Sequence, residues 1–251
     1  MCTVIVSFDP EAAVPVVLAG VRDEFAQRPW EPPAHHWPGR PGVLGGRDLQ
    51  AGGTWLAVDP AGRRVAALLN GRGLLAREEG RSSRGDLPLR ALAEGEPPAD
   101  DLTRYDPFHL VLADPEGVRL WHWDGTLLTA DKPAPGTHMI VNSGWEQGEE
   151  NHRVAWFRPR FRDAVRPGLP LDGEPGDYWG EWARLASGAG LATGDPRALI
   201  VRQALPDGGT WGSLSVTLVA VAPEGVRYDF SARPADPDAF YRVKPEMSSQ
   251  R

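Results

Sequence analysis

The sequence CTVIVSF at residues 2–8 is followed by VPVVLAGVRDE at residues 14–24. Both segments are rich in β-branched residues, and the Asp-Pro pair between them is typical of a turn. This pattern predicts an antiparallel hairpin in which Cys2 lies opposite a residue between Ala19 and Arg22. The pairing would bring the chain's only cysteine to the end of the sheet where the second strand becomes charged.

The charged end of the predicted hairpin has a chemical consequence. Cys2 would lie at this end of the hairpin together with Arg22, Asp23 and Glu24. A nearby guanidinium favours the thiolate form of cysteine. If Met1 is removed, as is usual before a small second residue, the freed α-amine of Cys2 could act as a base for the thiol, and Asp23 could hold that amine. In the alternative interpretation, Cys2 is an inert strand residue and Arg22 and Asp23 form a surface ion pair of little energetic weight.

Length and composition bound the class of protein. The chain has 251 residues, of which 41% are hydrophobic, so it can bury a core, and we expect one domain over residues 1–243 with a frayed tail at residues 244–251. The net charge of -7 disfavours broad binding to nucleic acid or to an anionic membrane surface. The absence of a membrane-length apolar run, of a basic secretory leader and of a second cysteine predicts a cytoplasmic protein.

Strand-like runs dominate the chain, including ALIVRQA at residues 198–204. Turn sequences join many of them, namely DPAG at residues 59–62, DPEG at residues 114–117 and APEG at residues 222–225. Tight turns connect antiparallel neighbours, so largely antiparallel sheets are expected. Several strands are apolar on both faces, and each face must therefore be covered.

Helical patterns are fewer. They predict helices at residues 86–94, 150–165 and 177–187, whereas the residues rich in Pro and Gly at 29–46 and 163–176 predict loops. Two packed sheets with helices on their outer faces satisfy the need for cover, and the fold class is expected to be α+β.

Three segments of the sequence resemble one protein family. MCTVIVSF at residues 1–8, LAGVRDEFAQRP at 18–29 and LGGRDLQAGGTWLAVDPAGRRVAALLN at 44–70 are similar to the N-terminal signature of the NRDE family, also called the Transport and Golgi organisation 2 family. A weaker similarity runs through SRGDL at 83–87 and HMIVNS at 138–143. The resemblance implies the N-terminal nucleophile hydrolase fold, a four-layer αββα sandwich, which agrees with the layers inferred from the strands.

The resemblance also implies roles for five residues. By a longer-range similarity to choloylglycine hydrolase and penicillin V acylase, Cys2 would be the nucleophile, with Arg22 and Asp23 as its electrostatic partners. Asn70 and Asn142 would contact the oxyanion and the amine, since side-chain amides donate hydrogen bonds without carrying charge. Taken alone, each Asn ends a strand-like run, where Asn is also common as a turn residue. These roles predict cleavage of an amide C–N bond in a small substrate, with no required cofactor.

Two positions depart from the family pattern. Val21 stands where the family has Asn, and Leu214 aligns where family members tend to have Arg. The alternative function is therefore a non-catalytic binding or trafficking protein of the same fold that handles haem or a lipid or acyl ligand. Most of the ten Trp residues are expected in the core, and a minority could line an apolar pocket for such a ligand.

No Walker loop, HExxH or CxxC motif is present, and no metal site is predicted. The identity of the substrate or ligand and the oligomeric state do not follow from the sequence.

Overall fold

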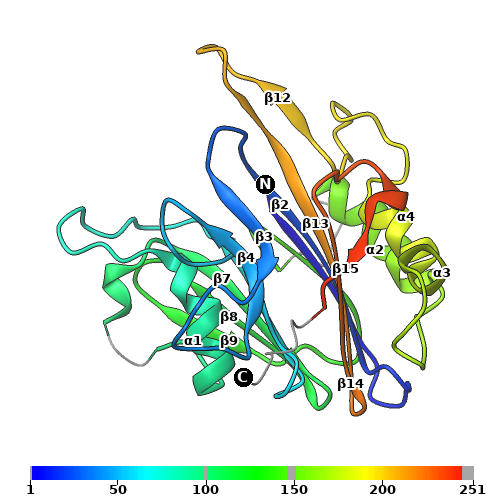
Figure 1. The fold of residues 1–251 in the computed structure, drawn as a ribbon. Helices are drawn as coiled ribbons and strands as arrows, with labels where there is room; N and C mark the ends of the chain where they lie inside the picture. Colours follow the sequence, from blue (N-terminus) through cyan, green and yellow to red (C-terminus); the bar gives the residue numbers. More distant parts are fainter. Residues whose placement is uncertain (1, 99–100, 146–150, 245–251) are drawn as a thin grey trace, which may run out of the picture.

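The fold consists of two antiparallel β-sheets packed face to face, with helices on both outer faces (Figure 1). The structure is a computed structural model and describes residues 2–98, 101–145 and 151–244. The layer order is αββα, which confirms the fold class expected from the strand patterns and from the family resemblance. No helix within these described ranges is long and apolar enough to cross a membrane.

The first sheet contains the hairpin that opens the chain. Its strands follow the order β11-β10-β1-β2-β13-β14-β15, and β12 pairs with β13. The strands are β1 (Thr3–Phe8), β2 (Val16–Phe25), β10 (Gly136–Val141), β11 (Gly144–Trp145), β12 (Arg202–Ala204), β13 (Thr210–Ala222), β14 (Gly225–Ser231) and β15 (Tyr241–Arg242).

The second sheet is a meander in which every strand pairs with its neighbour in sequence. Its strands are β3 (Trp30–Ala34), β4 (Leu44–Asp48), β5 (Leu56–Asp59), β6 (Arg64–Asn70), β7 (Phe108–Asp114), β8 (Gly117–Trp123) and β9 (Leu128–Asp131). The three predicted turn sequences join β5 to β6, β7 to β8 and β13 to β14, as expected.

In the part of the chain that the structure describes, four α-helices cover the outer faces of the two sheets (Figure 1). Helix α1 (Leu87–Glu94) packs on the second sheet, while α2 (His152–Asp163), α3 (Pro175–Trp179) and α4 (Glu181–Ala186) cover the first. Side chains alternate between layers along each strand: Val4 and Val6 of β1 pack between the sheets, whereas Ile5 faces the helices. Likewise Val65 of β6 lies between the sheets and Ala66 faces α1. The hydrophobic core is thus divided into three layers.

Several expected elements differ in the structure. The helix predicted at 177–187 is interrupted at Gly180, whose φ of 48° and ψ of -117° suit glycine rather than a residue with a Cβ. The predicted strand at 198–204 is regular only over β12, from residue 202. Part of the predicted loop at 29–46 is β3, which tolerates its two prolines because it is an edge strand.

The remaining helix predictions are close to the observed boundaries. A 3₁₀ turn at Arg84–Asp86 precedes α1, and α2 ends at Asp163, before the predicted residue 165. Residue 150 lies outside the described residues, as does the predicted tail at residues 244–251 apart from its first residue.

Candidate functional site

The opening hairpin forms with a register inside the range that the sequence predicts. Strands β1 and β2 pair antiparallel with Thr3 opposite Val21, and the same register sets Cys2, one residue earlier, opposite Arg22. The Cys2 thiol donates a hydrogen bond to the carbonyl oxygen of Asp23, with Sγ at 3.5 Å. Cys2 is partly buried at the border of the core between the sheets. The local pairing thus brings three of the five predicted site residues together.

The electrostatics of the thiol differ from the expectation. Burial raises the pKa of Cys2 from 9.0 to about 11, and the negative charge of Asp23 adds to the rise. Arg22 lowers this pKa, as expected from a guanidinium, but its effect is smaller. The prediction that Arg22 would make Cys2 a thiolate is therefore wrong, because the desolvation of the thiol outweighs the electrostatic effect of Arg22. Cys2 carries its proton at neutral pH.

Arg22 is held by partners that the sequence does not reveal. Its side chain is buried between the sheets, and its guanidinium carbon lies 4.4 Å from the centre of the Trp55 ring. Nη2 lies 3.6 Å from Oδ2 of Asp48, which closes β4 in the second sheet. A cation stacked on an indole and paired with a carboxylate is strongly fixed in position.

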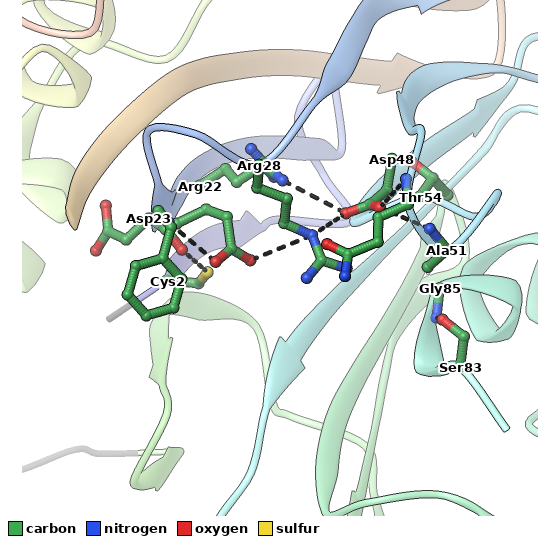
Figure 2. A network of polar contacts seen from close by, with 12 residues as sticks. Cys2, Arg22, Asp23, Arg28, Asp48, Ala51, Thr54, Ser83 and Gly85 are labelled. Carbon is green, nitrogen blue, oxygen red and sulfur yellow. Dashed lines mark hydrogen bonds and ion pairs between the residues drawn. The ribbon is translucent and has the colours of Figure 1, made fainter. Parts of the chain in front are cut away.

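Asp48 joins two arginines and a turn into one network (Figure 2). Its Oδ2 accepts a hydrogen bond of 2.5 Å from Nε of Arg28, and its Oδ1 accepts from the backbone N–H groups of Gln50 and Ala51 at 3.0 and 2.9 Å. Burial alone would raise the pKa of Asp48, but these hydrogen bonds and the charges of Arg28 and Arg22 outweigh it and hold the pKa below its usual value. Asp48 is therefore ionised and orders the rim of the site.

Asp23 faces the helix layer rather than the core between the sheets. Its Oδ1 accepts a hydrogen bond of 2.6 Å from Oγ of Ser213, and its Oδ2 lies 4.0 Å from Nη1 of Arg153 in α2. Arg153 is buried and also donates to Thr3 Oγ1 at 2.9 Å and to the Ala198 carbonyl oxygen at 2.7 Å. Burial raises the pKa of Asp23, while the hydrogen bond from Ser213 and the charge of Arg153 oppose that rise. Arg153 is a second cation at the site that the sequence interpretation missed.

The two departures from the family pattern lie close to Asp23. Val21 is buried in the core beneath the helices, so an apolar residue suits its surroundings. Leu214 falls at a β-bulge between Ser213 and Ser215, where the register of β13 against β2 shifts. The second cation near Asp23 thus comes from α2 instead of from the strand position that Leu214 occupies.

The two predicted asparagines are linked to one another, but only Asn70 lines the cleft beside Cys2. Nδ2 of Asn142 donates a hydrogen bond of 2.7 Å to the carbonyl oxygen of Asn70. The carbonyl oxygen of Asn142 in turn lies 3.3 Å from Nε2 of His109, which must donate because a carbonyl can only accept. Asn142 therefore orients Asn70, and its expected contact with an oxyanion is not supported by the geometry.

A histidine pair lies behind this link. The rings of His109 and His122 stack with their centres 4.5 Å apart, and their Nδ1 atoms are 3.0 Å from one another. Burial, with a smaller contribution from the charge of His122, lowers the pKa of His109 to about 4. His109 is thus neutral at physiological pH and serves to anchor Asn142.

A cleft of about 450 Å³ is bordered by Cys2, Arg22, Asp23, Asp48 and Asn70. The described residues that line it include Cys2 and Asn70 together with the charged side chains Arg22, Arg28, Arg81, Arg84, Asp23, Glu24, Asp48 and Asp106. Within the described ranges, no three His, Cys, Asp or Glu residues group in a way that could hold a metal ion. The arrangement offers a thiol, the side-chain amide of Asn70 and charges of both signs around a space that fits a small molecule.

Comparisons with known proteins were made for sequence and for structure. A family model described as Transport and Golgi organisation 2 matches residues 1–168, which is more than half of the chain. Among solved structures, a Caenorhabditis elegans N-acylethanolamine-hydrolyzing acid amidase (NAAA) ortholog is similar over 97% of this chain and 100% of that chain, with 10% sequence identity and a TM-score of 0.48. The comparison with curated proteins found no match.

Proposed function

Because the chain belongs to the Transport and Golgi organisation 2 family and holds Cys2 opposite Arg22 in a cleft, we propose that it is an N-terminal nucleophile amidase. Its reaction is the hydrolysis of an amide C–N bond in a small substrate, with Cys2 as the nucleophile. The observation that carries this proposal is the position of Cys2, which the hairpin sets beside Asp23 and which shares the cleft with Asn70.

The chemistry requires removal of Met1, which lies outside the described residues. The α-amine of Cys2 then has an unperturbed pKa of about 7.7–8.0 and is a suitable base at neutral pH. Sγ attacks the carbonyl carbon of the substrate while the thiol proton passes to this amine. The tetrahedral intermediate collapses with loss of the leaving amine, which takes up the proton, and a thioester remains. Water then hydrolyses the thioester to a carboxylic acid and restores the thiol.

The raised pKa of the thiol supports a mechanism with a separate base. A thiol with a pKa of about 11 is protonated at neutral pH, so it becomes a nucleophile only when a neighbouring group accepts its proton during the attack. Asp23 borders the same end of the hairpin, and Arg153 lies 4.0 Å from its carboxylate. This charge arrangement suits an amine that alternates between its neutral and protonated forms.

Asn70 is the side chain best suited to stabilise the oxyanion. It lines the cleft with Cys2, and Asn142 holds its backbone through a 2.7 Å hydrogen bond. A single preorganised donor of this kind contributes about 2.7–4 kcal/mol to transition-state stabilisation. In this proposal Arg22 organises the charges of the cleft, and Asn142 acts through Asn70.

The same cleft supports an alternative proposal, in which a protein without hydrolytic activity binds haem. Guanidinium groups in the cleft could pair with the propionates, and the thiol of Cys2 could ligate the iron. A lipid or acyl ligand is less suited to the many charged side chains around the cleft. The amidase proposal uses the hairpin geometry and Asn70 together, which haem binding does not require.

Two measurements test the amidase proposal. The intact mass of protein purified from its native cell should correspond to the loss of Met1, and 2-cyanobenzothiazole, which condenses with a 1,2-aminothiol, should label it at Cys2. Release of free amine from small N-acyl amides should require the thiol and be lost in Cys2→Ala. A mass increase equal to the acyl group, present in the wild type and absent in Cys2→Ala, would identify the thioester.

Retention of Met1, or hydrolysis that survives Cys2→Ala, would contradict the amidase proposal. Spectral titration with haem gives the complementary result. Tight binding by the wild type that Cys2→Ala abolishes, in a protein that releases no amine, would favour the binding alternative.

A further inference from the structure

Arg84 differs from the other arginines of the cleft because no carboxylate of a described residue lies within ion-pair distance of its guanidinium. Arg22 and Arg28 lie 3.6 and 2.5 Å from Asp48, and Arg81 lies 3.7 Å from Asp106. Among the described residues, no carboxylate oxygen is recorded within 4.0 Å of the Arg84 guanidinium, whose Nη1 donates to the carbonyl oxygen of Pro107 at 2.8 Å. We infer that Arg84 binds an oxyanion of the substrate, either a carboxylate or a phosphate.

The partial burial of Arg84 makes the absence of a nearby carboxylate among the described residues evidence for an anionic ligand. Arg84 is partly buried, and removal of a cation from water is unfavourable unless an anion or several acceptors compensate it. Burial lowers the pKa of Arg84; the charge of Asp106 opposes this fall, while the smaller effects of Arg81 and Arg28 add to it. A negatively charged ligand group in direct contact with the guanidinium would compensate its burial.

Arg84 also lies within electrostatic reach of the nucleophile. Ionised Cys2 would raise the pKa of Arg84, as the carboxylate of Asp106 does. Both residues line the same cleft of about 450 Å³. A single small ligand can therefore meet Arg84 with one end and Cys2 with the other.

The loop that carries Arg84 is fixed before any ligand binds. The backbone N–H of Thr54 donates to the carbonyl oxygen of Gly85 at 2.7 Å, and Ser83 Oγ accepts from the N–H of Gly85 at 3.2 Å. The segment that contains Gly53 and Thr54 packs closely against the loop that carries Arg84, so that a Cβ at Gly53 would collide with the backbone of Gly85. The Nη1 bond of Arg84 holds the side chain itself, so the guanidinium is preorganised to bind an anion.

The geometry of guanidinium selects the ligand class. Its planar N–H groups match the paired oxygens of a carboxylate or phosphate and bind both with charge-assisted hydrogen bonds. Ser82 and Ser83 line the same cleft, and a hydroxyl group can donate a further bond to an oxyanion. Assignment of the ligand as a substrate rests on the proposed amidase function, whereas binding of an oxyanion at Arg84 does not.

The test measures binding to the Cys2→Ala variant, which lacks the nucleophile, by isothermal titration calorimetry. The probes are N-hexanoylglycine, its neutral carboxamide N-hexanoylglycinamide and the phosphonate N-hexanoylaminomethylphosphonate, which share one acyl chain and differ at the group that would meet Arg84. At least one anion should bind ten-fold or more tightly than the carboxamide. The tighter of the two identifies carboxylate or phosphate chemistry.

Substitutions then show which residue causes the tighter binding of the anionic probe. Arg84→Met added to Cys2→Ala should abolish the preference for the anion, and Arg84→Lys should keep part of it because the charge remains. Arg162→Ala, at an exposed arginine of α2, is the matched control and should leave the preference unchanged. The comparison of the probes in Cys2→Ala needs no change at Arg84, so a folding defect in those variants cannot hide the result.

Equal affinities for the anions and the carboxamide, undetectable binding of both anions, or a preference that survives Arg84→Met would overturn the inference. Failure of the proposed function has a different signature, since Cys2→Ala would still prefer an anion while the wild type released no amine. If the amidase proposal holds and only the anion site at Arg84 is wrong, the wild type hydrolyses N-hexanoylglycine and N-hexanoylglycinamide with equal kcat/KM.

Discussion

The Sγ atom of Cys2 lies 3.5 Å from the carbonyl oxygen of Asp23, so the thiol stands at the boundary between two charged networks. Side chains of consecutive strand residues point to opposite faces. Arg22 therefore joins Asp48 between the sheets, while the Asp23 carboxylate joins Arg153 on the helix side. The hydrogen bond from the Cys2 thiol to the backbone carbonyl oxygen of Asp23 links the thiol to β2. The thiol remains protonated at neutral pH in spite of this bond.

The first prediction concerns the reactivity of the thiol. A rise in the pKa of Cys2 from 9.0 to about 11 lowers the thiolate fraction at pH 7 about 100-fold. The greater nucleophilicity of a more basic thiolate recovers about ten-fold of this, so iodoacetamide should alkylate the folded protein about ten-fold more slowly than the unfolded chain. The rate in the folded protein should still rise at pH 10. A plateau below pH 9 would contradict the raised pKa.

The second prediction concerns Asp48. Asp48→Asn keeps the hydrogen bonds from the turn but removes the charge that pairs with Arg28 and Arg22, and should lower the free energy of unfolding by about 2 kcal/mol. Because the folded pKa of Asp48 lies below its usual value of 3.8, its stabilising effect is present above pH 3.8 and is lost as the pH falls through the folded pKa.

Urea unfolding across pH 2–7 measures this contribution of Asp48. The difference between the wild type and Asp48→Asn should shrink as the pH falls below about 4. Asp163→Asn, at an exposed aspartate of α2, is the control and should change stability by less than about 0.5 kcal/mol. A difference between wild type and Asp48→Asn that does not vary with pH would rule out an electrostatic role for Asp48.

The third prediction concerns Arg153. Burial raises the folded pKa of Asp23 above 3.8, so its ionisation reduces stability as the pH rises through that folded pKa. Arg153→Met removes a cation 4.0 Å from the carboxylate and should raise this pKa further. The destabilisation caused by the substitution should then be about 1 kcal/mol larger at pH 7 than at pH 4.

The loss of hydrogen bonds from Arg153 to Thr3 and Ala198 adds a destabilisation that does not depend on pH. Chemical unfolding at the two pH values separates this constant part from the electrostatic part. Arg153→Lys, which retains the charge, should restore most of the pH-dependent part. Equal effects of Arg153→Met at pH 4 and pH 7 would show that Arg153 is purely structural.

The fourth prediction separates the two asparagines. If Asn70 stabilises the oxyanion, Asn70→Ala should lower kcat for amide hydrolysis by about 10²–10³. Asn142→Ala leaves Asn70 in place and removes one bond to its backbone, so we expect a smaller loss of kcat with little change in KM. Steady-state kinetics on one amide substrate distinguish them. A loss in Asn142→Ala as large as in Asn70→Ala would mean that Asn142 contacts the substrate directly.

The opening hairpin was predictable because its information is local. The β-branched residues of 2–8 and 14–24 and the turn between them predict the pairing and set Cys2 opposite a residue between Ala19 and Arg22. The structure narrows this range to Arg22. The turns that join β5 to β6 and β7 to β8 were predictable for the same reason. The break at Gly180 was not, because a single glycine in a helical pattern is compatible with a continuous helix.

Residue types and their order along the chain were thus sufficient for the layers, the hairpin and the presence of a thiol, an arginine and a carboxylate at one sheet end. The partners Asp48 and Arg153 became apparent only from the packing, since they reach the site from β4 and α2. Packing also reversed the expected ionisation of Cys2, because a pKa depends on the burial of the group as well as on its neighbours. It likewise distinguished Arg84 from the other cleft arginines, since the pairing of charges depends on distances that no sequence pattern records.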